Sequence, residues 1–163
     1  MKIAFLAMSA VLLTLVGVSD ASAQGLAGRA SVIDGDTIEL RGQRVRLWGI
    51  DAPEGGQTCQ DAQGRDYRCG TVAANALAEF IGAGNISCDS RYLDDWDRVV
   101  SVCVRMQDDV ELNAWLVRNG FALDYPHFSD GAYARVEDDA RQEGLGVWAG
   151  RIEAPWEWRR RQR

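Results

Sequence analysis

Apolar and polar residues alternate in two short stretches near the start of the chain, over 37–41 and over 44–48. Such alternation is typical of strands that bury one face. Gly42 and Gln43 lie between the two stretches and predict a two-residue hairpin turn. The first predicted unit is therefore a hairpin with its apolar face turned toward a core.

A second hairpin and three helices are predicted further along the chain. Residues 85–92 and 98–105 have the pattern of two strands joined by a turn at Asp95 and Trp96. Three helices are expected, each with a glycine just beyond its end: 71–81, 112–119 and 133–143. Strands with interspersed helices and tight turns indicate the α+β class, and a small β-barrel fits this order.

The first 23 residues have the pattern of a secretory signal peptide. Lys2 precedes an apolar run over 3–18, which is shorter than the roughly 20 residues that span a bilayer. The tripeptide Ala21-Ser22-Ala23 fits the small-residue pattern of a cleavage site. We expect residues 1–23 to be removed and the protein to be periplasmic or secreted. An uncleaved membrane anchor is the alternative.

The rest of the chain, residues 24–163, is expected to form one domain. Its core is expected over about 30–150, followed by a Trp- and Arg-rich tail over 151–163. Residues 156–163 could form a solvated tail or a helix that lies on the barrel.

Four cysteines in an exported chain indicate disulfides: Cys59, Cys69, Cys88 and Cys103. They allow three pairings, and four free buried thiols are the alternative. No pair has C-x-x-C spacing and the chain has a single histidine, which argues against a zinc site.

The formal net charge of −6 limits how the protein could bind nucleic acid. Attraction to phosphate would have to come from local arginines or from a metal ion in an acidic pocket. Lys2 is the only lysine, so every other cationic chain is an arginine, whose planar fork suits phosphate. This charge argues against a protein that simply coats DNA.

Carboxylates gather at the open end of the first predicted hairpin. With Gly42 and Gln43 as the turn, Asp34 would lie level with Asp51 and Asp36 level with Gly49, and Glu54 would follow just beyond. Like charges so close together require a cation or protons, and hard oxygen ligands suit Ca²⁺ or Mg²⁺. Ordinary turn residues and a helix cap are the alternatives.

Two arginines complete this candidate site. In the same register Arg46 would lie opposite Glu39, so a cross-strand ion pair is its structural alternative. Arg98 lies among acidic residues of the second hairpin, where a surface ion pair is the alternative. Guanidinium groups near a carboxylate-bound metal suit phosphodiester hydrolysis, because they stabilise negative charge in the transition state. Glu54 could accept the proton of the attacking water.

Other hydrolase classes are excluded by what the sequence lacks. It has no nucleophile-elbow motif, and its single histidine cannot supply the ligands of a histidine-based metal nuclease.

Several segments together resemble the staphylococcal nuclease-like (thermonuclease) family. They are VIDGDTI at 32–38, VRLWGIDAPE at 45–54, RVV at 98–100, LNAWLVRNG at 112–120 and GVW at 146–148. The first two are the most specific, and the resemblance runs from about Ala30 to Trp148 in order and with compatible spacing.

The resemblance implies a five-stranded OB-like barrel packed against about three helices. It also implies Ca²⁺-dependent endonuclease activity on DNA and RNA, with one ion per site and products that carry 3′-phosphate and 5′-hydroxyl ends. A monomer is expected, with no stable protein partner and no membrane attachment after signal cleavage.

The matching motifs also imply the roles of individual residues. Asp36 and Asp51 would bind the metal directly together with the backbone carbonyl of Ala52. Asp34 and Glu54 would act through metal-bound water, and Glu54 resembles the proposed general base of the family. Arg46 and Arg98 would hold and stabilise the phosphate.

Four further positions bear on the resemblance. Asp97 stands where members of the family often have glycine. Tyr125 and Phe128 are candidates for contacts with substrate, with packing at the barrel rim as the alternative, and His127 is expected at the surface.

The cysteine positions fit this arrangement as two pairs. Cys59 and Cys69 bracket a polar loop behind the metal-site segment, and a symmetric second hairpin would place Cys88 level with Cys103. We therefore expect the disulfides Cys59–Cys69 and Cys88–Cys103.

Two other functions are compatible with parts of this pattern. The first is a non-catalytic OB-like module that binds nucleic acid or a protein. The second is an exported disulfide-bonded OB domain unrelated to nucleases. The presence of all the acids and both arginines favours the enzyme over the binding module.

Overall fold

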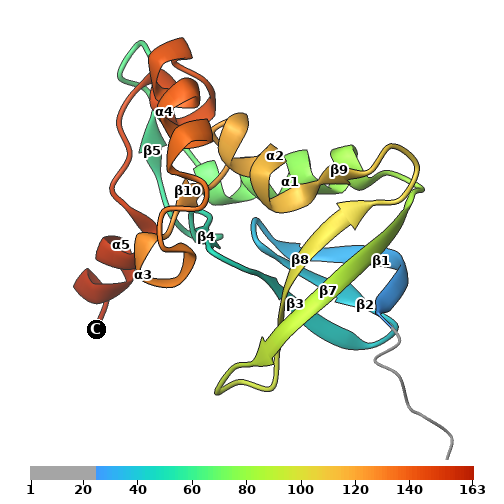
Figure 1. Cartoon of the computed structure of the whole chain (residues 1–163). Coiled ribbons are helices and arrows are strands. Elements are labelled where there is room, and N and C mark those ends of the chain that lie inside the picture. Colours follow the sequence, from blue (N-terminus) through green and yellow to red (C-terminus); the bar gives the residue numbers. More distant parts are fainter. Residues whose placement is uncertain (1–24) are drawn as a thin grey trace, which may run out of the picture.

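The computed structural model describes residues 25–163 (Figure 1). The predicted signal peptide, residues 1–23, lies outside the described residues. Within the described part, no helix combines the length and apolar character needed to cross a membrane.

Five strands form a closed barrel, as expected. They are β1 (Leu26–Asp34), β2 (Thr37–Leu40), β3 (Gln43–Leu47), β7 (Asn85–Leu93) and β8 (Val99–Arg105). Their order is β3-β2-β1-β7-β8, and β8 also pairs in parallel with β3, which closes the barrel. Closure leaves the five strands without a free edge between β3 and β8.

Five shorter strands lie at the ends of the barrel or outside it: β4 (Ile50–Asp51), β5 (Cys59–Gln60), β6 (Asp66–Tyr67), β9 (Val110–Glu111) and β10 (Leu123–Asp124). Strand β4 pairs with β10, β5 pairs with β6, and β9 pairs antiparallel with the end of β8. The pairing of β4 with β10 matters most for function, because it fixes the segment that carries Asp51.

The three expected helices are present: α1 (Cys69–Ile81), α2 (Leu112–Arg118) and α4 (Ala134–Glu143). Further along the chain lie three short elements: α3 (Pro126–Ser129), the 3₁₀ helix η1 (Gly146–Ala149) and α5 (Pro155–Arg161). Figure 1 shows α1 and α2 above the barrel and α3 beside α5 to its left. Residues 156–163 were expected to form either a solvated tail or a helix, and most of them belong to the helix α5.

The predicted register of the first hairpin is wrong. Ile38 pairs with Val45 and Glu39 with Arg44, so the turn residues are Arg41 and Gly42. Both turn residues have positive φ, 52° and 79°, as the favoured two-residue hairpin turns require. The predicted and observed registers differ by two positions. Each side chain therefore points to the predicted side of the sheet, and the prediction of the buried face is correct.

The second hairpin has the predicted register over most of its length. Cys88 lies opposite Cys103 and the two form a disulfide. A bulge between Ser90 and Tyr92 shifts the pairing near the tip by one residue. The second predicted disulfide, Cys59–Cys69, is also present, so both expected pairs are confirmed.

The main core fills the barrel and the space beneath α1 and α2. Its fully buried members include Ile38, Leu40, Val45, Leu47, Leu77, Ile86, Leu112 and Leu116. On α1, Val72 is exposed, whereas the neighbouring Ala73 is buried. A smaller cluster, containing the disulfide Cys59–Cys69 with Leu123 and Val147, supports the C-terminal segment.

Candidate active site

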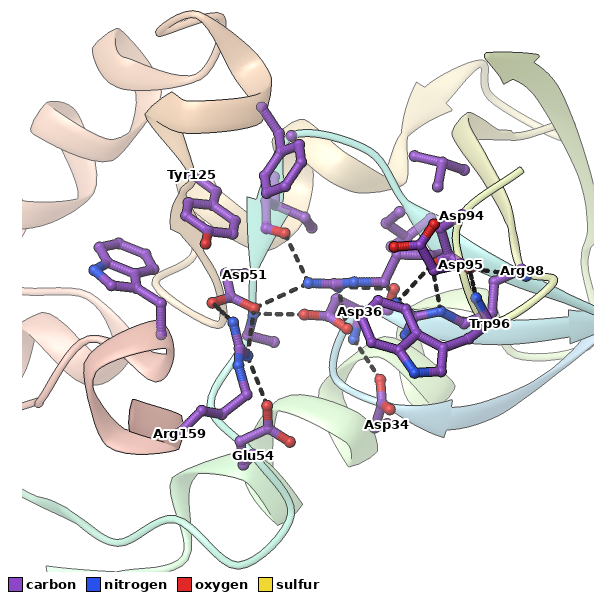
Figure 2. A pocket seen from close by; sticks show the side chains of 18 of the residues that line it. Asp34, Asp36, Asp51, Glu54, Asp94, Asp95, Trp96, Arg98, Tyr125 and Arg159 are labelled. Atoms are coloured by element: carbon purple, nitrogen blue, oxygen red, sulfur yellow. Dashed lines mark hydrogen bonds and ion pairs between the residues drawn. The ribbon is translucent and has the colours of Figure 1, made fainter. Parts of the chain in front are cut away.

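A cleft of about 940 Å³ opens where the barrel meets α3 and α5. All the residues assigned to the site from the sequence line it: Asp34, Asp36, Arg46, Asp51, Ala52, Glu54 and Arg98. Figure 2 shows the acids in the middle, Arg159 near Asp51 and Glu54, and Arg98 beside Asp94 on the opposite side.

The turn between β1 and β2 presents the first two acids. Asp34 ends β1, and its Oδ1 accepts a hydrogen bond from the backbone N–H of Asp36 at 3.1 Å. A side chain at Gly35 could not fit, because its Cβ would lie 2.7 Å from the Cβ of Ala52. The turn can therefore approach the segment after β4 only because glycine stands between the two acids.

Asp36 and Asp51 come together through the backbone rather than through the predicted hairpin register. Asp36 Oδ2 accepts a hydrogen bond of 2.7 Å from the N–H of Ala52, next to Asp51. Asp51 itself lies on β4 opposite Leu123 of β10, and its side chain is fully buried. The expected meeting of the two acids is thus present, although the pairing assumed for it was wrong.

Arg46 lies between these two carboxylates. It forms an ion pair with Asp36 and a second one of 2.9 Å with Asp51 Oδ1, and it also donates to the carbonyl of Ile50 at 3.2 Å. The alternative pairing with Glu39 is absent, since Arg46 lies opposite Thr37. Burial alone would lower the pKa of the Arg46 guanidinium, but the charges of Asp36 and Asp51 outweigh burial and raise it.

A second arginine in the acidic centre, Arg159 of α5, was not predicted. Its Nη1 lies 3.0 Å from Asp51 Oδ1 and 2.7 Å from Glu54 Oε1, and its Nη2 lies 2.8 Å from Asp51 Oδ2. Burial would lower the pKa of Arg159, but its hydrogen bonds with Asp51 and Glu54 raise it above the ordinary value. The only sequence signal was the Trp- and Arg-rich run PWEWRRR.

Helix α5 is seated against the cleft by contacts of residues that precede Arg159 in the chain. The rings of Trp156 and Tyr125 are stacked, with centroids 4.9 Å apart and planes 4° from parallel. Before the helix, the buried Gln57 donates a hydrogen bond of 2.6 Å to the carbonyl of Glu153. An isolated antiparallel β-bridge between Gln60 and Arg151 holds the same segment. These contacts place the guanidinium of Arg159 over the acids.

Arg98 lies away from the central carboxylates and is bound to Asp94. Its Nε and Nη2 lie 2.8 Å and 2.7 Å from Asp94 Oδ2, and its guanidinium faces the ring of Trp96 at 5.3 Å. The neighbouring Asp97 has a φ of 58°, the left-handed conformation that glycine adopts most easily. The partner of Arg98 is thus Asp94, and Asp97 carries the backbone turn.

Two of the acids have raised pKa values. Burial, together with the charge of Asp36, raises the pKa of Asp34 to about 6. Burial also raises the pKa of Asp51, while the hydrogen bonds of Arg159 and the charge of Arg46 oppose that rise. Both shifts reflect carboxylates that are crowded and partly removed from water.

The donor chemistry of the site suits a hard divalent cation. Asp36, Asp51 and the carbonyl of Ala52 would offer oxygen ligands, as Ca²⁺ prefers. Within residues 25–163, no group of three or more acidic, histidine or cysteine side chains is arranged to hold a metal. Arg46 and Arg159 lie against the carboxylate oxygens of Asp36 and Asp51. The residues fit the cation, and the arginines hold the positions that it would need.

Aromatic side chains form the walls of the cleft on both sides. Tyr125 and Phe128 line it on the α3 side, and Tyr92 and Trp96 line it on the hairpin side. Trp96 is 73% exposed and Phe128 is 48% exposed, so both rings present apolar surface to solvent. His127 is exposed and does not line the cleft, as expected.

A protein-family model and several known proteins are similar to this chain in sequence. The model of the family described as staphylococcal nuclease homologue matches residues 44–150. The succinoglycan biosynthesis protein ExoI of Rhizobium meliloti (strain 1021) is 41% identical over 148 residues, covering 90% of this chain and 77% of that protein. Protein ParB of Escherichia coli is 31% identical over 172 residues, covering 96% and 92%. Micrococcal nuclease of Shigella flexneri is 28% identical over 144 residues, covering 79% and 77%.

These matches agree with the architecture described above. The family model covers more than half of the chain, including Arg46 and Arg98, and ends before Arg159. The relatives align with this chain over most of their own lengths. On both grounds, the chain belongs to the family of staphylococcal nuclease homologues.

Proposed function

We propose that the protein is an exported, divalent-metal-dependent nuclease that hydrolyses phosphodiester bonds in DNA or RNA. The observation that carries this proposal is the single cleft in which carboxylates, arginines and aromatic rings face one another. Family membership and the likeness to a micrococcal nuclease support the same reaction. The two disulfides support export, because disulfides persist in oxidising compartments.

The charges of the cleft explain how an acidic protein could bind phosphate. Six acidic residues line the cleft: Asp34, Asp36, Asp51, Glu54, Asp94 and Asp95. Six arginines also line it: Arg44, Arg46, Arg98, Arg159, Arg160 and Arg163. The cleft is thus balanced in charge, whereas the whole chain carries −6. One divalent cation would make the cleft positive and suited to nucleic acid.

In this proposal Asp36, Asp51 and the carbonyl of Ala52 bind one Ca²⁺ ion, and Asp34 and Glu54 act through water. When bound, Ca²⁺ polarises the phosphate and offsets its negative charge. The Glu54 side chain is 37% exposed and lines the cleft, so it can reach a water molecule beside the phosphate.

Glu54 is the proposed general base. It removes a proton from the attacking water, whose oxygen forms a bond to phosphorus. The bond between phosphorus and the 5′ oxygen breaks, and that oxygen leaves as a hydroxyl after it gains a proton from solvent. The products would carry a 3′-phosphate and a 5′-hydroxyl.

Arg46 and Arg98 are the proposed stabilisers of the negative charge that builds up on the phosphate oxygens. Arg46 is already fixed in the centre of the cleft by Asp36 and Asp51. Arg98 would exchange part of its contact with Asp94 for the phosphate, from the hairpin side of the cleft.

The test is hydrolysis of labelled DNA and RNA by the oxidised protein in Ca²⁺ and in EDTA. We expect cleavage only with the metal, and a loss of about 100-fold or more in Glu54→Gln and in Arg98→Ala. Arg65→Ala is the matched control, because Arg65 is exposed and pairs with Asp61 outside the cleft. Polynucleotide kinase should label the products without prior phosphatase treatment, since their 5′ ends are hydroxyls.

A folded protein that cleaves nothing in Ca²⁺, Mg²⁺ or Mn²⁺ would contradict the proposed reaction. Retained binding of labelled DNA in that case would support the non-catalytic binding module instead.

A further inference from the structure

We propose that Arg159 is a third substrate-binding arginine, which exchanges Asp51 and Glu54 for a backbone phosphate when the divalent cation binds. This inference rests on the proposed function and adds to it a residue that lies outside the part of the chain matched by the family model.

Asp51 is held by two arginines at once. Its Oδ1 accepts hydrogen bonds from both Arg46 and Arg159, and its Oδ2 accepts one from Arg159. The carboxylate is fully buried, so a cation cannot approach it from an open side. Direct coordination by Asp51 therefore requires one of the two guanidinium groups to give up its position.

The contacts of the two arginines indicate which of them moves. Arg46 also donates to the backbone carbonyls of Asp36 and Ile50, and its side chain is 14% exposed. Within residues 25–163, the guanidinium of Arg159 bonds only to the side chains of Asp51 and Glu54, and the side chain is 35% exposed. A bound cation would supply both carboxylates with a stronger charge partner, so Arg159 is the group that leaves.

The seating of α5 determines where the released guanidinium goes. Trp156 remains stacked on Tyr125 and Gln57 holds the carbonyl of Glu153, so the helix stays against the cleft. Arg160 of the same helix and Arg163, just beyond its end, line this cleft too. The freed side chain would face a bound strand from the side opposite Arg98, and its planar fork suits a phosphate.

Competition for the same carboxylates links the two events. If the cation and Arg159 exclude each other at Asp51 and Glu54, removing Arg159 must raise metal affinity. Removing it must also weaken nucleic-acid binding when the metal is present, because one phosphate contact is lost. A residue that only holds the fold together would not produce these opposite changes.

The first measurement is calorimetric titration of Ca²⁺ into wild type, Arg159→Gln and Arg161→Gln, without nucleic acid. We expect about tenfold tighter Ca²⁺ binding by Arg159→Gln. Arg161→Gln is the matched control, since Arg161 lies on the same helix and pairs with Glu153 outside the cleft. Unchanged or weaker Ca²⁺ binding by Arg159→Gln would overturn the proposal.

A second variant, Arg159→Lys, provides the test if Arg159→Gln does not fold. Lysine keeps a positive charge near Asp51 but cannot form the two-pronged contact with both carboxylate oxygens. Its Ca²⁺ affinity should exceed that of wild type by a smaller factor, with an unchanged circular dichroism spectrum.

The second measurement is binding of a fluorescent single-stranded DNA in Ca²⁺, in an Arg98→Ala background in which cleavage is expected to be about 100-fold slower. Adding Arg159→Gln should lower affinity about tenfold and reduce the slope of log K against log salt by about 0.7. Adding Arg161→Gln should leave the slope unchanged. Equal slopes for the two double variants would contradict a phosphate contact by Arg159.

The two proposals can fail separately. If wild type binds and cleaves with Ca²⁺ while Arg159→Gln has unchanged affinities, only the exchange is wrong. If neither protein binds a divalent ion, the metal dependence in the proposed function is wrong and the exchange fails with it.

Discussion

Arg98 depends on one acidic residue for its position, whereas Arg46 has two carboxylates and two backbone carbonyls around it. Asp94 also accepts hydrogen bonds from the backbone N–H groups of Trp96 and Arg98, so one side chain holds both the turn and the arginine. At the scale of single residues, the hairpin side of the cleft is therefore easier to perturb than its centre.

Asp94→Asn should lower the free energy of unfolding by about 1 kcal/mol at neutral pH. Burial raises the pKa of Asp94, but hydrogen bonds from Arg98 and the turn outweigh burial and hold the pKa below its ordinary value. The stabilisation is therefore present above the ordinary carboxyl pKa and is lost as pH falls through the lowered one. Urea unfolding of both proteins at neutral pH and at about pH 3 measures this.

The expected result is a difference between the two proteins at neutral pH that shrinks at low pH. A difference that stays constant over this range would show that Asp94 does not act through its charge.

Asn113 joins α2 to the barrel at the scale of elements. Its amide N–H groups donate to the carbonyls of Trp48 and Ser101, and its Oδ1 accepts from the N–H of Cys103. The side chain is fully buried, so no water can replace these bonds. One side chain thus ties the first residue after β3 to the middle of β8.

Asn113→Ala should destabilise the protein by about 3 kcal/mol, because it leaves buried backbone groups without partners. Asn75→Ala, at an exposed position of α1, is the matched control and should change stability by less than about 0.5 kcal/mol. Thermal and urea unfolding of the two variants provide the comparison. Similar small effects of both substitutions would contradict the role given to Asn113.

The disulfide Cys59–Cys69 closes a loop between residues 10 positions apart, next to the segment that carries α5. Replacing both cysteines by serine should lower the free energy of unfolding by about 3 kcal/mol through the gain in unfolded-state entropy. Unfolding curves of the double variant and wild type test this. An unchanged midpoint would mean that the loop is held by its other contacts alone.

Elements with a local signal could be predicted from the sequence, and elements that depend on tertiary contacts could not. The DGD turn and the DAPE segment carry their acids in the sequence itself, and the helix ends are marked by glycines. The first hairpin register was missed because Arg41, an unusual turn residue, adopts positive φ. Arg159 was missed because it lies 108 residues from Asp51, and only the docking of α5 brings them together.

At the scale of the whole molecule, a chain with a net charge of −6 has to bind a polyanion through one locally balanced cleft. The long-range field of the protein repels nucleic acid, so binding should depend on a few contacts within reach of the cleft arginines. A bound cation would change the sign of the cleft without changing the rest of the surface.

For wild-type protein, we expect the affinity for single-stranded DNA in Ca²⁺ to fall with salt, with a log–log slope of about −2 to −3. This slope corresponds to three or four phosphate contacts, which is fewer than the six arginines that line the cleft. Fluorescence anisotropy across a salt series measures the slope. A value near zero would place the binding energy in the aromatic walls instead.

The exclusive use of arginine in the cleft has a practical consequence for chemical modification. Acetylating and other amine-directed reagents find no side-chain amine among residues 25–163, so they would leave every charge of the cleft in place. Dicarbonyl reagents, which attack guanidinium groups, would remove those charges, and the more exposed Arg159 should react before the less exposed Arg46.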